Sequence, residues 1–433
     1  MSLGPFESVR ELTYDAPFPR LIPVRRAIDP VTEDDPAGAA KRQLEPLRGQ
    51  ITPGMSVAIT AGSRGIHDIA VVVKAAGEWL RDAGAEPFVV PAMGSHGGAT
   101  AEGQREVLAH LGITEESMGM PIRATMDTVE LDRCPDGPVV HLDANAAQAD
   151  GILVVNRIKA HTDFHGEVES GLAKICAIGL GKHRGAAGIH RYGSRGLARW
   201  VPEVAHRIIA SGKVLGGLAI IENALERTAR IALLPANEIG RAGETALLRE
   251  SQRLMGALPF DQLDLLVVDE LGKDKSGSGL DTNVIGRMMI RGTEEFDRPN
   301  ITNISVHDIS AASDGNAVGI GLADFIPFRV LEKIDLHAMY VNAVTSGIGG
   351  VQRAQLPLAF RTDRDTVAAA LLMCGRADLE NARVVRMHDT LDTVSLLVSE
   401  SLRAEVEAAD DLTIVGESGP MTFDADGALL AWS

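Results

Sequence analysis

Short apolar runs that end in glycine-rich loops alternate with amphipathic segments through the first half of the chain. The apolar runs are typical of buried strands, and the spacing of apolar residues in the segments between them is typical of helices. The pattern predicts strands at 55–62, 87–93, 151–156 and 214–223, and helices at 67–87 and 100–112, the second capped by Thr100. The order strand, helix, strand, helix favours parallel strands joined by crossover helices.

The same pattern restarts after a helix-like segment that ends near residue 258, where we place a domain boundary. In the second half it predicts strands at 263–271, 302–306, 338–342 and 394–398, and a helix at 365–374. The segment through about residue 45 is rich in proline and charge, which predicts an irregular arm. We therefore predict an α/β fold of two domains, residues 1–258 and 259–433, with mostly parallel sheets and an active-site cleft between them.

Composition narrows the class of protein. The 433 residues suffice for two or three domains, and a formal net charge of −17 argues against binding to nucleic acid phosphates. The three cysteines are sparse and far apart, which fits a reducing cytosol and predicts a cytoplasmic protein. We expect no membrane span and no signal peptide, because no apolar run has the required length and the first residues lack the charge pattern. The sequence leaves open whether the protein forms a homo-oligomer.

Three glycine-rich segments follow predicted strands, at 61–65, at 94–98 and after Asn156. Ligands of open α/β sheets bind beyond the carboxyl ends of the strands, so we expect these loops to converge on a site. Arg64 in the first loop could hold a carboxylate or phosphate through paired hydrogen bonds, or form an ordinary surface ion pair. His96 in the second loop has glycine neighbours that favour an accessible ring with a functional role.

Histidines cluster in the segment that follows Asn156. Four of the twelve histidines of the chain lie there: His161, His165, His183 and His190. Imidazole suits proton transfer near neutral pH and is a common ligand of nickel, zinc and copper, so the cluster indicates catalysis or metal binding. A single histidine after a strand could equally be a solvated loop residue. We interpret His183, between Lys182 and Arg184, as part of a solvated basic turn.

Three lysines are further candidates. Lys174 lies in the apolar stretch 171–180, where desolvation would favour a nucleophilic amine or covalent anchor, unless the side chain reaches back to water. Lys273 and Lys275 lie in the loop 270–281 of the second domain, where they could meet an anion or stay solvated. The sequence holds no Walker A motif, no dinucleotide-binding glycine motif and no cysteine pair with zinc spacing.

Taken together, the motifs AGSRG, AMGSHGGAT and SGLAK resemble those of the lactate racemase superfamily of nickel-pincer-dependent 2-hydroxyacid racemases and epimerases. The most specific element is a spacing. The family has a Ser-Gly-x-x-Lys motif followed sixteen positions later by a histidine, and here Ser170 to Lys174 fits the motif and His190 stands at that position. The resemblance covers most of the first domain and, more loosely, the second.

The resemblance implies a cofactor. Lys174 would carry a covalently attached nickel-pincer nucleotide made by separate cofactor-synthesis accessory enzymes, and His190 would be the protein ligand of nickel. The substrate would be a small 2-hydroxy acid. Hydride would leave Cα for the cofactor and return to the other face, while two acid/base groups move the hydroxyl proton.

The resemblance also implies roles for the remaining candidates. Arg64 would bind the carboxylate of the substrate, and His96 would be one of the two acid/base groups. The second would be His161 or His165. The motif HTDFHG favours His161, because it preserves a histidine, a short spacer and a glycine.

The sequence departs from the lactate enzyme at several positions. Ala61 replaces an acidic residue, a Gln and Lys pair of the second domain has no clear counterpart, and no Trp occurs near residues 340–360. We therefore expect a hydroxy acid other than lactate, whose polar tail meets Lys273, Lys275 or Arg287 of the second domain.

Two other functions stay open from the sequence. His161, His165 and His190 could bind a metal directly in a lyase or hydrolase. Alternatively, the chain could be a non-enzymatic anion-binding protein with Arg64 and the glycine-rich loops as its site.

Overall fold

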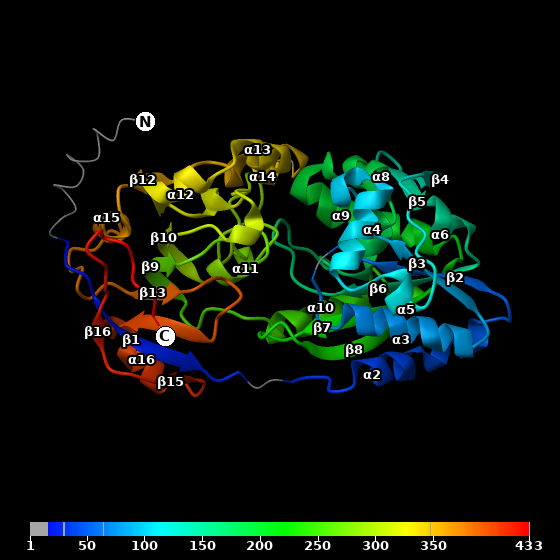
Figure 1. Cartoon of the computed structure of the whole chain (residues 1–433), viewed down its shortest axis with the longest axis horizontal. Coiled ribbons are helices and arrows are strands. Elements are labelled where there is room, and N and C mark those ends of the chain that lie inside the picture. Colours follow the sequence, from blue (N-terminus) through cyan, green and yellow to red (C-terminus); the bar gives the residue numbers. More distant parts are fainter. Residues whose placement is uncertain (1–15, 29–30, 64, 347, 433) are drawn as a thin grey trace. The chain divides into compact units, whose positions relative to one another are not determined.

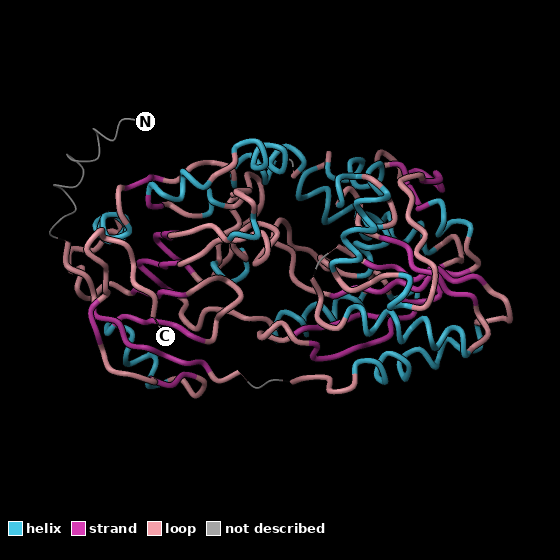
Figure 2. Tube along the Cα trace, viewed as in Figure 1, coloured by secondary structure: helices cyan, strands magenta, loops and turns pink. Residues whose placement is uncertain are grey.

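The structure is a computed structural model that describes residues 16–28, 31–63, 65–346 and 348–432. Internal contacts divide the chain into two compact units. We call residues 30–255 the N-terminal unit, and residues 256–433 together with the residues before 30 the C-terminal unit. Figure 1 labels the elements of each unit, and Figure 2 distinguishes helix, strand and loop along the chain.

The N-terminal unit is built on a five-stranded sheet in the order β3-β2-β6-β7-β8. The first four strands are parallel, and β8 pairs antiparallel with β7. Their bounds are Ser56–Ala61 (β2), Glu86–Pro91 (β3), Gly151–Arg157 (β6), Val214–Glu222 (β7) and Thr228–Pro235 (β8). Along β6, Val154 belongs to one hydrophobic cluster and Val155 to another, so both faces of the sheet are buried.

Helices supply the apolar side chains that cover each face of this sheet. On the face of Val155 these are α2 (Pro36–Leu44) and α3 (Ile69–Asp82), and on the face of Val154 they are α9 (Gly193–Ile209) and α10 (Ala242–Leu254). Between β3 and β6 the chain forms α4 (Ala101–His110), α5 (Glu115–Met118), α6 (Ala144–Gln148) and an antiparallel ribbon of β4 (Thr128–Arg133) and β5 (Val139–Asp143).

The C-terminal unit is built on a mixed sheet in the order β12-β11-β10-β9-β13-β14-β1-β15, with β16 paired to β1. The strands from β12 to β13 are parallel, and the others are antiparallel. Their bounds are Arg20–Arg26 (β1), Gln262–Val268 (β9), Asn300–Val306 (β10), Phe325–Pro327 (β11), Leu358–Phe360 (β12), Val384–Met387 (β13), Ser395–Ser399 (β14), Leu412–Ile414 (β15) and Gly419–Pro420 (β16).

Both faces of this second sheet are also buried. Leu265 and Leu266 are neighbours on β9 and belong to different hydrophobic clusters. The helices of the unit are α11 (Thr282–Ile285), α12 (Phe328–Lys333), α13 (Leu336–Thr345), α14 (Ile348–Arg353), α15 (Asp363–Leu372) and α16 (Arg403–Ala408). The predicted α/β class with mostly parallel sheets is therefore confirmed.

Two sequence predictions of local structure are wrong. The predicted irregular arm contains β1 and α2, because Leu21, Ile22 and Val24 are buried in pairing with β14, far away in sequence. The segment 338–342, predicted as a strand, lies inside α13. The side chain of Asp335 accepts hydrogen bonds from the backbone N–H groups at the start of this helix, a capping signal that the apolar run alone does not carry.

The three cysteines, Cys134, Cys176 and Cys374, are free and buried. Burial raises the pKa of each thiol. Within the described ranges, no helix combines the length and the apolar character needed to cross a membrane.

Candidate functional site

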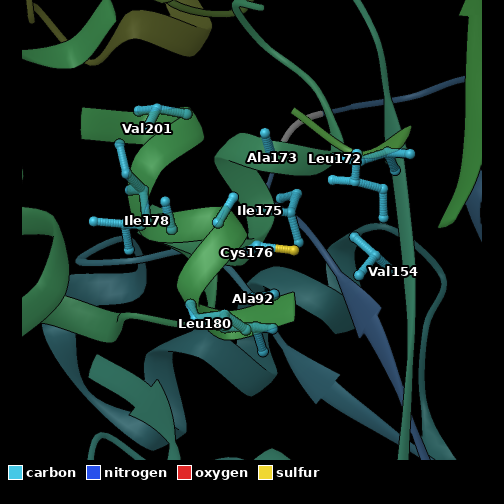
Figure 3. Packing of buried hydrophobic residues seen from close by; sticks show 14 of the residues in the cluster. Ala92, Val154, Leu172, Ala173, Ile175, Cys176, Ile178, Leu180 and Val201 are labelled. Atoms are coloured by element: carbon cyan, nitrogen blue, oxygen red, sulfur yellow. The ribbon is translucent and has the colours of Figure 1, made fainter. Parts of the chain in front are cut away.

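The segment with the Ser-Gly-x-x-Lys motif lies in the N-terminal unit after β6. It forms a short helical turn, α7 (Leu172–Lys174), then a π-helical turn (Ile175–Gly179), and then α8 (Lys182–His190). Figure 3 shows how Ile175, Cys176 and Leu180 pack into the buried apolar cluster. The backbone around Lys174 is therefore held by its apolar neighbours, and π-helical turns often occur at functional sites.

Lys174 and His161 are in direct contact. Nζ of Lys174 lies 2.6 Å from Nε2 of His161, and both residues are partly buried. The backbone N–H of Asp163 donates to Nδ1 of His161 over 3.0 Å, so the single proton of the neutral ring is on Nε2. Nε2 is then the ring nitrogen that faces the amine of Lys174. The structure thus brings together two residues that the sequence predicted for the site.

Glu169 organises the loop that carries both histidines. This buried carboxylate accepts from the backbone N–H of His161 at 2.6 Å, and its Oε1 lies 3.1 Å from Nδ1 of His165. Because an ionised carboxylate only accepts, the His165 ring has its proton on Nδ1 and its lone pair on Nε2. His165 and His161 therefore present opposite nitrogens as donors.

His190 ends α8 and is partly buried. Burial lowers the pKa of His190, a positive charge on Lys174 lowers it further, and Asp163 partly opposes both effects. These electrostatic effects place Lys174, Asp163 and His190 in one neighbourhood. At neutral pH the ring is therefore the uncharged imidazole, the form that binds a metal.

His96 lies in the loop after β3, and its side chain is exposed. Its Nδ1 is 2.7 Å from Oγ of Ser63, in the loop after β2. The two glycine-rich loops that the sequence singled out thus meet at this hydrogen bond. Arg64, the predicted carboxylate-binding residue beside Ser63, lies outside the described residues.

The three basic residues predicted for substrate binding in the C-terminal unit contact nearby groups of that unit. Nζ of Lys273 donates to the backbone carbonyl of Gly277 at 2.6 Å. Lys275 forms an ion pair with Asp389 at 3.3 Å. Arg287 donates to Asp324 at 2.7 Å. A role of Lys273 in binding substrate stays a prediction.

Glu244 is a site residue that the sequence did not reveal. It is buried on α10, and it accepts from the backbone N–H groups of Ala173 (3.1 Å) and Gly240 (2.7 Å). Burial raises the pKa of Glu244, and these hydrogen bonds oppose the rise. A Cβ built at Gly171 would overlap Oε1 of Glu244, which explains why the motif has glycine before its lysine turn. No local pattern signals a partner so distant in sequence.

The structure corrects the interpretation of one basic residue. His183 and Arg184 are exposed, as expected for a solvated turn, whereas Lys182 is fully buried. Its two hydrogen-bond acceptors and its ion-pair partner come from three distant segments, described below, so its charge is compensated inside the protein. Among the residues that the structure describes, no group of three or more His, Cys, Asp or Glu side chains is arranged to hold a metal ion.

No family model matches the sequence, and no curated protein matches it. The solved structures that are similar to the chain include the following two. One is the crystal structure of a protein from Thermotoga maritima, with 13% sequence identity and a TM-score of 0.47, covering 74% of this chain and 84% of that chain. The other is the lactate racemase apoprotein from Thermoanaerobacterium thermosaccharolyticum, with 11% identity and a TM-score of 0.46, covering 86% of this chain and 88% of that chain.

Proposed function

We propose that the protein is an isomerase, a racemase or epimerase of a 2-hydroxy acid, that works with a nickel-pincer nucleotide attached to Lys174. The observation that carries the proposal is the contact between the amine of Lys174 and Nε2 of His161, in the electrostatic neighbourhood of His190. The motif spacing from Lys174 to His190 supports it independently.

The residues present fit such a group in two respects. Lys174 sits on a turn whose apolar neighbours are buried, and its amine contacts the His161 ring, an arrangement that would hold a covalent anchor in place. His190 is kept uncharged by burial, as a nickel ligand needs. When bound, the group would supply a nickel centre and a carbon that accepts hydride from Cα of the substrate.

The side chains of the protein would handle the proton and the carboxylate. As hydrogen leaves Cα, the hydroxyl proton must also leave so that the C=O bond can form. We assign this proton to His165, because the hydrogen bond to Glu169 leaves Nε2 of His165 as the basic nitrogen. His96 would serve the opposite face, and Arg64 would hold the carboxylate.

We propose for His161 a role that differs from the one that its motif suggested. Its Nε2–H faces Lys174, so we propose that it holds the lysine side chain in place. His161→Gln tests this assignment, because glutamine can donate a similar hydrogen bond but cannot exchange a proton near neutral pH. We expect His161→Gln to keep more activity than His165→Gln in assays for loss of optical purity.

The decisive experiment is intact-mass and metal analysis of the protein co-expressed with the cofactor-synthesis enzymes. We expect an added mass on Lys174 and nickel in the purified protein. Both should be absent in Lys174→Arg, whereas Lys74→Arg, a change at an exposed lysine of α3, should retain them. Wild-type protein with neither an added mass nor nickel would overturn the proposal.

Activity should then be tested with a panel of single-enantiomer hydroxy acids. Loss of optical purity should require both the accessory enzymes and Lys174. A metal-binding lyase or hydrolase would instead bind metal without an added mass on Lys174. An anion-binding protein would retain its ligand affinity in Lys174→Arg and His161→Gln.

A further inference from the structure

Lys182 has three polar partners in the interior of the N-terminal unit. The side chain is fully buried at the start of α8. Its Nζ lies 2.5 Å from the carbonyl oxygen of Pro91, 2.9 Å from Oε1 of Gln104 and 3.1 Å from Oδ2 of Asp143. Lys182 donates hydrogen bonds to the first two of these atoms and forms an ion pair with the carboxylate of Asp143. Lys182 also has a backbone φ of +52°, which non-glycine residues seldom adopt unless their surroundings hold them there.

Gln104 connects Lys182 to the loop that carries His96. Gln104 lies on α4 and is fully buried. Its Nε2 donates to the carbonyl oxygen of Gly94 at 2.9 Å and to that of His96 at 3.2 Å. Because an ammonium group can only donate, Lys182 forces Oε1 of Gln104 toward itself and thereby turns Nε2 toward the loop. The lysine charge thus determines which way the amide faces.

Stability alone does not account for the buried pair of Lys182 and Asp143. Asp143 is fully buried, and its Oδ1 accepts from the backbone N–H of Ala146 at 2.9 Å. Burial raises the pKa of Asp143 and lowers that of Lys182, and each charge opposes the shift of the other. Apolar residues of similar size often serve equally well in place of a buried ion pair. The specific feature here is that the lysine orients a glutamine beneath a candidate catalytic loop.

We propose that Lys182 and Gln104 are positioning residues that fix His96 relative to the helix carrying His190. Lys182 is the first residue of α8 and His190 is the last, about 12 Å along one helix. The loop of His96 is therefore anchored to one end of the helix that has the predicted nickel ligand at its other end. The roles of His96 and His190 rest on the proposed function, whereas the anchoring itself does not.

The sharpest test is Gln104→Glu. A glutamate keeps an acceptor for Lys182, so the buried charge retains its partner, but it has no N–H to donate to the carbonyls of Gly94 and His96. Gln148→Glu is the matched control, because Gln148 is exposed at the end of α6 and undergoes the same change of charge. A second variant, Lys182→Met/Asp143→Asn, removes both buried charges together and leaves no unpaired ion.

Hydrogen exchange of the peptide 92–100, measured by mass spectrometry on unloaded protein, reports on the anchor. We expect exchange roughly tenfold faster in Gln104→Glu and in Lys182→Met/Asp143→Asn, and wild-type exchange in Gln148→Glu. Exchange of β9 in the other unit should stay unchanged in all three. Wild-type exchange of 92–100 in Gln104→Glu would overturn the proposal.

Kinetics of the loaded enzyme provide the second measurement. A misplaced His96 should lower kcat of Gln104→Glu about tenfold with little change in KM, because substrate binding does not depend on this ring. An unchanged kcat would overturn the link from the anchor to His96. If the wild-type protein itself isomerises no hydroxy acid, the proposed function fails, and hydrogen exchange alone decides on the anchor.

Discussion

Each unit contains a histidine that is hydrogen-bonded to a carboxylate, and the two pairs differ in their access to solvent. In the N-terminal unit, Nδ1 of His165 lies 3.1 Å from Glu169, and the histidine side chain is 38% exposed. In the C-terminal unit, Nδ1 of His307 lies 3.0 Å from Asp363, and Nε2 of the same ring lies 3.0 Å from Oγ of Ser305. His307 is only 2% exposed, and Ser305 and Asp363 are also buried.

The comparison shows that residue types and hydrogen bonds do not by themselves make a catalytic site. Ser305, His307 and Asp363 have the composition and the bonding order of a hydrolase triad. A serine nucleophile must reach a substrate, however, and Ser305 is fully buried on β10. The triad therefore holds a strand end to α15, whereas the His165 pair keeps a ring that a small molecule can approach.

The largest expected effect is a loss of kcat in His165→Ala. Removing a general base typically costs 10²–10⁴ in rate, and the exposed side chain contributes little to folding. We expect kcat per nickel-loaded molecule to fall by about that factor while the melting temperature stays within a few degrees. His183→Ala, an exposed histidine of α8, is the control. Equal activity of the two variants would remove His165 from the mechanism.

His307→Ala should instead lower the stability of the protein and leave its activity unchanged. The change leaves Ser305 and one oxygen of Asp363 without this buried partner, which should lower the free energy of unfolding of the C-terminal unit by about 3 kcal/mol. Hydrogen exchange of β10 measures this loss, with β6 of the other unit as the reference. Because His307 is buried, we expect kcat per folded, loaded molecule to be unchanged, and a loss of kcat at full folding would contradict the structural role.

Lowering the pH should weaken the hydrogen-bond network of His307 and Asp363 in the wild-type protein and so reduce its stability. Burial alone would raise the pKa of Asp363, but hydrogen bonding and charge from His307, followed by Arg329 and the N–H of Leu429, lower it from 3.8 to about 2. A lowered carboxyl pKa stabilises the fold above pH 3.8, and this contribution is lost as the pH falls toward 2. The loss should reach about 2 kcal/mol.

Asp363→Asn is the matched control for the acid experiment. Its free energy of unfolding, compared with that of the wild type in denaturant titrations between pH 5 and about 2, should lack this part of the pH dependence. Parallel curves for the two proteins would show that Asp363 is not the group responsible.

The smallest effect should come from Glu169→Gln. Glutamine preserves one carbonyl oxygen, but its NH₂ group replaces an oxygen that accepts from His161 N–H or His165 Nδ1–H. Misorienting His165 should lower kcat about tenfold, which corresponds to ~1.4 kcal/mol. Glu167→Gln, at an exposed position in the same loop, should leave kcat unchanged.

Much of the fold could be predicted because its signals are local. The strand, helix and strand at β2, α3 and β3 follow directly from the spacing of apolar residues, and Thr100 caps α4 as its position indicated. By contrast, β1 is a strand only because β14 pairs with it, and the sequence around Leu21 does not reveal a partner so far along the chain.

The residues of the candidate site also fall into those with a local sequence signal and those without one. His161 and Lys174 could be chosen from a short motif, and the structure brings them into contact. Glu244 and Gln104 could not, because each acts on backbone groups outside its own helix and resembles any polar residue of an amphipathic helix. Supporting residues of this kind become visible only when the three-dimensional contacts are known.

The burial of all three native thiols has a practical consequence for spectroscopy. Cys134, Cys176 and Cys374 are shielded, and their raised pKa values leave little of the reactive thiolate at neutral pH. Maleimide dyes should therefore label the wild-type protein slowly and a cysteine introduced at exposed His183 quickly. A single fluorophore on α8 would then follow loading of the proposed cofactor in real time, without prior removal of the native sulfhydryl groups.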